Sequence, residues 1–76
     1  MLPAEESDHI VLVITEAFAC GAEGRIPRGY RLLTESIQET RRLATAWAGE
    51  ALPIWETALE RFKERFPTEW YPDQQG

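Results

Sequence analysis

The 76-residue sequence has few features that would cross-link a small fold or place it in a membrane. Its single cysteine, Cys20, excludes an internal disulfide and any zinc site built from four cysteines. The longest apolar run covers only residues 10–14, whereas a membrane-spanning helix needs about 18 or more. Residues 1–24 contain no lysine or arginine, so the basic region of a signal peptide is missing. These absences predict a cytoplasmic protein.

The chain is also short for a hydrophobic core that is stable alone. A domain of this size buries about 60% of the surface that its unfolded chain exposes, and such a core contributes about 3–5 kcal/mol. The composition, 43% hydrophobic and 28% charged, is typical of a globular protein. We therefore expect a single helical domain over 1–76 that gains stability from a partner or a second copy.

The formal net charge of −5 is unevenly distributed along the chain. Residues 1–24 hold five acidic side chains, residues 25–49 hold five arginines and two glutamates, and residues 50–76 hold six acidic and three basic side chains. A basic middle segment thus lies between two acidic ends. Because the total is acidic, the charge disfavours sequence-independent binding to nucleic acid.

Apolar periodicity predicts an all-α fold, a small antiparallel three-helix hairpin or bundle. The three helices are expected at about 5–21, 28–48 and 53–66. The β-branched run at 10–14 is also compatible with a buried strand. A helix is favoured there, because helical spacing continues through residue 20 and no second strand-like run exists to pair with it.

Glycine and proline set the expected helix boundaries. Three glycines and a proline within 21–29 indicate a loop. Pro53 lacks the amide proton that a helix interior requires, so it is expected to start the third helix rather than lie within it. The aromatic tail after Pro67 is expected to fold back across the helices.

The first predicted helix has an unusually broad apolar face, which covers about half of its circumference. Val11, Ile14 and Phe18 share one stripe of this face, and Leu12 lies outside it. A face of this width exceeds what one neighbouring helix covers. The sequence therefore predicts self-association through Val11, Leu12, Ile14 and Phe18.

The third predicted helix carries an acidic stripe of Glu56, Glu60 and Glu64, spaced four residues apart. Arg31 and Arg42 of the second helix are expected to oppose it. One interpretation is a solvated face that these arginines partly neutralise. The other is a docking surface for a basic partner protein.

Three tryptophans are many for a core of this size, so at least one is expected to face a groove or a partner. Trp70 and Tyr71 are the candidates because they follow the last periodic residue. A tail that packs on its own chain fits the sequence equally well.

Two further patterns support alternative functions. Glu6 and His9 are spaced three residues apart, as in the ligand pairs of metal-binding helical bundles, and predict a metal or small-ligand site if an oligomer doubles the pair. The arginines of the middle segment are candidates for contact with an anion or nucleic acid, and residues 14–30 partly imitate a helix-turn-helix. They are Arg25, Arg28, Arg31 and Arg42. Pro27 disfavours a recognition helix at this place.

No pattern indicates an enzyme or a cofactor, and the main prediction includes no metal. Cys20 and His9 are eleven residues apart on one predicted helix, about 16 Å, which is too far for a nucleophile and its base. The sequence therefore predicts a non-catalytic protein–protein interaction module. A small acidic regulator, inhibitor or adaptor of a bacterial or mobile-element type fits the size and charge.

Overall fold

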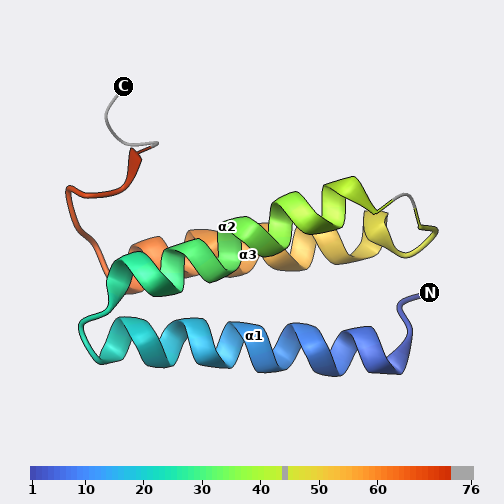
Figure 1. Ribbon diagram of the computed structural model, residues 1–76, viewed down its shortest axis with the longest axis horizontal. Helices are drawn as coiled ribbons and strands as arrows, with labels where there is room; N and C mark the ends of the chain where they lie inside the picture. The colour runs from blue at the N-terminus through green and yellow to red at the C-terminus, as the bar shows by residue number, and fades with distance from the viewer. Residues whose placement is uncertain (44, 73–76) are drawn as a thin grey trace.

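The structure is a computed structural model that describes residues 1–43 and 45–72, and it consists of three antiparallel helices (Figure 1). In chain order they are α1 (Ala4–Ala22), α2 (Ile26–Arg42) and α3 (Ala48–Arg65). The described residues contain no strand, so the predicted all-α three-helix fold is confirmed. In the same residues no helix is both long and apolar enough to span a membrane.

Helix α1 ends in a turn that only glycine adopts readily. Gly24 has a φ of 85°, in the left-handed region that side chains with a Cβ disfavour. The amide of Arg25 donates to the carbonyl of Cys20, and that of Gly24 donates to the carbonyl of Gly21. This pair of hydrogen bonds is the Schellman motif, which satisfies the last carbonyls of a helix.

Helix α2 begins at Ile26, so the loop predicted at 21–29 is shorter than expected. Pro27 lies in the first turn of α2, where its missing amide proton costs nothing because no intrahelical acceptor is available there. Gly29, assigned to the loop by its composition, is a buried residue within α2.

The second helix was predicted too long and the third too short. Helix α2 ends at Arg42 instead of 48, and α3 begins at Ala48, which leaves Pro53 inside the helix. The extra first turn is held by two amides, of Glu50 and Ala51, that both donate to the carbonyl of Trp47. Ala51 is fully buried, so the turn before Pro53 adds to the core although Pro53 itself cannot donate a helical hydrogen bond.

The core lies where the three helices and the tail meet. Its largest fully buried side chains are Tyr71, Phe62 and Leu33. The ring of Phe18 meets that of Phe62 edge to face at 5.5 Å, so α1 and α3 are joined by an aromatic contact at this end. The other buried members of the core are Ile10, Ala17, Ile37, Ala51, Trp55 and Ala58.

Gly29 marks a close approach between helices. A Cβ atom at this position would lie 2.5 Å from the carbonyl oxygen of Ala17 and 2.7 Å from the ring of Phe62. Both distances are far below van der Waals contact, and the first is to backbone, which cannot move aside as a side chain can. The absence of a side chain at Gly29 therefore permits the observed packing of α1, α2 and α3.

Replacing Gly29 by alanine tests this packing. We expect Gly29→Ala to lower the free energy of unfolding by about 1–2 kcal/mol, because the cost of overpacking exceeds the gain in helix propensity. Gly49→Ala is the matched control, since Gly49 is also helical and a Cβ there meets nothing within 4 Å. Gly49→Ala is expected to leave the free energy of unfolding unchanged or to raise it, as measured by urea unfolding. If both variants lose the same amount of stability, this account of Gly29 is wrong.

Candidate functional site

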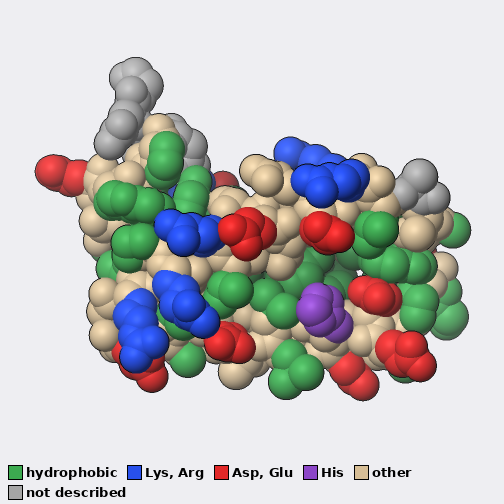
Figure 2. Space-filling model, viewed as in Figure 1, with side chains coloured by type: hydrophobic (Ala, Val, Ile, Leu, Met, Phe, Trp, Pro, Cys, Tyr) green, Lys and Arg blue, Asp and Glu red, His purple; other side chains and the backbone are tan. Residues whose placement is uncertain are grey.

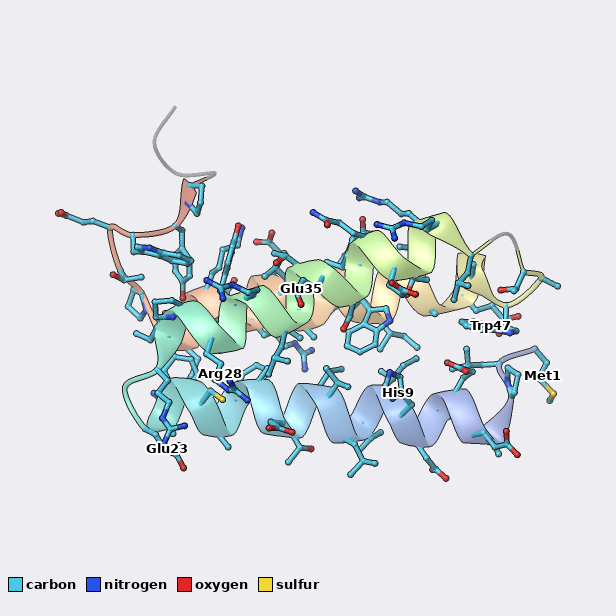
Figure 3. The ribbon with its side chains drawn as sticks, in the orientation of Figure 1. Met1, His9, Glu23, Arg28, Glu35 and Trp47 are labelled. Carbon is cyan, nitrogen blue, oxygen red and sulfur yellow. The ribbon has the colours of Figure 1, made fainter. Side chains whose placement is uncertain are left out.

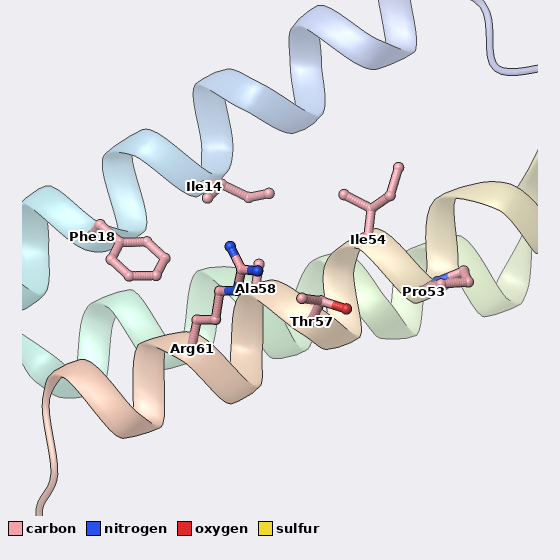
Figure 4. A pocket seen from close by; sticks show the side chains of 7 residues that line it. All are labelled: Ile14, Phe18, Pro53, Ile54, Thr57, Ala58 and Arg61. Carbon is pink, nitrogen blue, oxygen red and sulfur yellow. The ribbon is translucent and has the colours of Figure 1, made fainter.

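Helix α1 is flanked by two grooves that differ in chemistry. The first lies between α1 and α3 and encloses about 460 Å³. In Figure 4, Ile14 and Phe18 of α1 face Ile54 and Ala58 of α3, and the Arg61 side chain points from α3 toward α1. Pro53 and Thr57 complete the lining. The walls of this α1/α3 groove are mainly apolar, and it carries one cationic group.

The α1/α3 groove continues toward the C-terminal end of α3. A second hollow shares Ile14, Phe18 and Arg61 with the first, and it adds Thr15, Glu64 and Arg65. No ion pair involving Arg61 occurs among the described residues. The groove therefore offers an apolar floor together with a cation that has no acidic partner in residues 1–43 and 45–72.

The four residues predicted to mediate self-association occupy two different faces. Ile14 and Phe18 are half-buried in the α1/α3 groove. Val11 is 59% exposed and lies three residues before Ile14 and seven before Phe18, so it belongs to the same helical stripe. Leu12 is 69% exposed, and it lies about 100° further round the helix than Val11. The structure thus brings Val11, Ile14 and Phe18 together and separates Leu12 from them.

The second groove, between α1 and α2, encloses about 280 Å³ and is acidic. Its charged and titratable residues are Glu6 and His9 from α1 and Glu35 and Glu39 from α2. Figure 2 looks onto this face, where the purple His9 lies among red carboxylates. Its remaining lining residues are Val13, Leu32, Ser36, Thr40, Leu43, Trp47 and Trp55.

Glu6 and His9 both line this α1/α2 groove, and Figure 3 shows His9 on the side of α1 that faces α2. No group of three or more His, Cys, Asp or Glu side chains in the described residues is arranged to hold a metal ion. The sequence analysis missed Glu35 and Glu39 as site residues. Their spacing of four residues, which puts both on one face of α2, was the available signal.

The acidic stripe of α3 is partly neutralised, but not by the arginines expected. Arg41, rather than Arg31 or Arg42, lies 3.3 Å from Glu56. Lys63 lies 3.3 Å from Glu60 on the same helix. The expected pairing was wrong because the side of α2 that faces α3 carries Thr34, Gln38 and Arg41 rather than Arg31 or Arg42. The role of Glu56, Glu60 and Glu64 in binding a basic partner stays a prediction.

Tyr71 belongs to the core and not to a partner surface. Its side chain is fully buried, and its hydroxyl donates a hydrogen bond of 2.6 Å to the carbonyl of Phe66. Its ring and that of Trp70 both pack against Tyr30 of α2, with centroids 5.1 and 5.2 Å away. Trp70 keeps 41% of its surface exposed. Of the two predicted partner-binding aromatics, only Trp70 remains accessible.

The arginines predicted to contact an anion or nucleic acid do not form one cluster. Arg25 lies 3.7 Å from Glu23 in the turn before α2. Arg28 and Arg31 are exposed near the start of α2, whereas Arg42 is its last residue. Fourteen residues of helix place Arg42 about 21 Å from Arg28. The fold therefore places Arg42 at the opposite end of α2 from Arg25, Arg28 and Arg31, which lie around the start of the helix.

Comparisons with protein-family models, with curated proteins and with solved structures find no match for this chain. The functional argument therefore depends on the two grooves.

The placement of Tyr71 leads to a prediction about the tail. Tyr71→Phe removes the hydrogen bond to the Phe66 carbonyl and is expected to lower the free energy of unfolding by about 0.5–1.5 kcal/mol. Trp70→Phe, which alters a partly exposed ring on the neighbouring residue, is expected to cost less than about 0.5 kcal/mol. Urea unfolding measures both. A larger loss for Trp70→Phe would show that the tail is held differently.

Proposed function

We propose that this protein is a non-catalytic interaction module of the small regulator or inhibitor kind, and that it forms a homodimer through the α1/α3 groove. The observation that carries the proposal is the groove itself: Ile14, Phe18, Ile54 and Ala58 form an apolar surface beside Arg61, which has no ion pair within residues 1–43 and 45–72. A groove with this lining is typical of sites that take the apolar face of a helix.

Charge complementarity supports a second copy as the occupant. Helix α1 contains four acidic side chains, Glu5, Glu6, Asp8 and Glu16, and no lysine or arginine. The last turns of α3 carry Arg61 and Arg65, which line the continuation of the groove together with Glu64. An α1 helix from another copy would therefore bring its apolar stripe to the groove and its carboxylates to Arg61 and Arg65.

The available area also fits a dimer. The Cα atoms extend over 36 × 27 × 15 Å, so the protein is a slab with two broad faces. A standard interface buries about 800 Å² on each partner, and a face of 36 by 27 Å has room for it. Dimerisation would also add to a core that is small for independent stability.

Substitutions at exposed positions test the dimer without disturbing the core. Ile54→Glu places a charge on the groove wall at a side chain that is 42% exposed, and it is expected to raise the dissociation constant at least tenfold. Leu12→Glu is the matched control, because Leu12 is as apolar, more exposed and outside the groove. Sedimentation equilibrium measures both, and circular dichroism checks that each variant stays helical.

Three outcomes would overturn the homodimer. One is a wild-type protein that stays monomeric at about 1 mM, the concentration at which a dimer held by only about 4 kcal/mol is half formed. Another is a dimer that dissociates in the Leu12→Glu variant but not in the Ile54→Glu variant, because the interface would then lie on the outer face of α1. The third is an unchanged dimer after Arg61→Glu, since reversing that charge should repel the acidic α1 of the second copy.

A further inference from the structure

Trp55 is the residue from which the inference starts. It belongs to α3, its side chain is only 3% exposed, and it lines the α1/α2 groove. Its indole N–H has no hydrogen-bond acceptor among the described residues. No fully enclosed side-chain nitrogen or oxygen in those residues lacks a partner, so the indole nitrogen must reach the open space of the groove.

The other polar side chains on the α2 wall do not accept this hydrogen. The Ser36 hydroxyl donates to the carbonyl of Leu32 at 2.8 Å, and the Thr40 hydroxyl donates to the carbonyl of Ser36 at 2.8 Å. Both hydroxyls are therefore engaged with the backbone of their own helix. The Trp55 N–H, on a residue that lines the groove, therefore remains as a donor without an acceptor in the described residues and is available to a bound one.

The groove also has an unbalanced negative charge. Glu6, Glu35 and Glu39 form no ion pair within residues 1–43 and 45–72, because the glutamates in the four ion pairs there are Glu23, Glu50, Glu56 and Glu60. Three carboxylates line a space of about 280 Å³ there. The half-buried ring of Trp47 lines the same space, and an indole face attracts cations.

These observations together specify a ligand with two features. It has a cationic group, which the three carboxylates and Trp47 attract, and it has a hydrogen-bond acceptor for the Trp55 N–H. We propose that the α1/α2 groove binds a lysine or arginine side chain of a partner protein, with a carbonyl oxygen of the same segment accepting from Trp55. A volume of about 280 Å³ admits one long side chain and excludes a folded element.

This site deepens the proposed function by naming the chemistry of the partner, but it does not depend on the homodimer. The residues of α1 that line it, Glu6, His9 and Val13, lie on a different side of the helix from Ile14 and Phe18 of the α1/α3 groove. Dimerisation and binding of a basic segment are therefore separate events, and each has its own test.

The test is a titration of the ¹⁵N-labelled full chain, followed through the indole N–H resonances of its three tryptophans. The probes are N-acetyl-arginine-methylamide and N-acetyl-lysine-methylamide, which carry both the cation and a carbonyl acceptor. N-acetyl-citrulline-methylamide is the control, because it has the shape of the arginine probe without the charge. We expect the Trp55 resonance to shift saturably with at least one basic probe, tenfold more tightly than with citrulline.

Charge-neutralising variants connect the shift to the groove. Glu35→Gln combined with Glu39→Gln is expected to weaken binding at least tenfold, since both substitutions keep the side-chain shape and remove two of the three charges. Glu60→Gln combined with Glu64→Gln, at the same spacing on α3, is the matched control and is expected to change affinity less than twofold. The indole spectrum itself reports whether each variant stays folded.

Binding should also persist in the Ile54→Glu variant, which separates this site from the dimer. The proposal is overturned if Trp55 shows no saturable shift with either basic probe, or if citrulline binds as tightly. It is equally overturned if the Glu60 and Glu64 variant weakens binding as much as the Glu35 and Glu39 variant, because the attraction would then come from overall charge. A shift that disappears only when the dimer dissociates would place the site at the dimer interface instead.

Discussion

The close contact between α1 and α2 at Gly29 is the constraint on which the rest of the structure depends. Without a side chain at this position, the backbone of α2 can approach the carbonyl of Ala17, and the ring of Phe62 can fill the remaining space. This contact sets how α2 is rotated and offset relative to α1. Helix α3 then packs mainly on α2, and it meets α1 chiefly through the Phe18 and Phe62 rings.

This arrangement explains why α1 has a groove on each side. The apolar face of α1 is too broad for α2 alone to cover, and α3 covers only part of the remainder. On one side Ile14 and Phe18 stay half-buried beside α3, in a groove that is also lined by Arg61. On the other side the acidic edges of α1 and α2 meet above Trp55. The two grooves therefore differ in charge and are suited to different occupants.

Two helix boundaries differ from those that the local glycine and proline signals predict, because tertiary packing outweighs these signals. Pro53 and the glycines near residue 29 are ordinary signals for a helix start and a loop, and both were interpreted in that way. Burial of Ala51 extends α3 by a turn before the proline, and the need for a close contact places Gly29 inside α2. In both places the energy of tertiary contacts exceeds a local preference of about 1–3 kcal/mol.

Periodicity, glycine and proline in the sequence were sufficient to determine three antiparallel helices, the broad apolar face of α1 and the proximity of Glu6 to His9. They determine these features because each depends on residues that are near one another in the chain. The pairing of Arg41 with Glu56, the burial of Tyr71 and the convergence of Glu6, Glu35 and Trp55 were decided by the tertiary structure. Each of these contacts joins residues from different elements. The rotation and offset of one element relative to another depend on close interhelical contacts, which the apolar periodicity of a single helix does not specify.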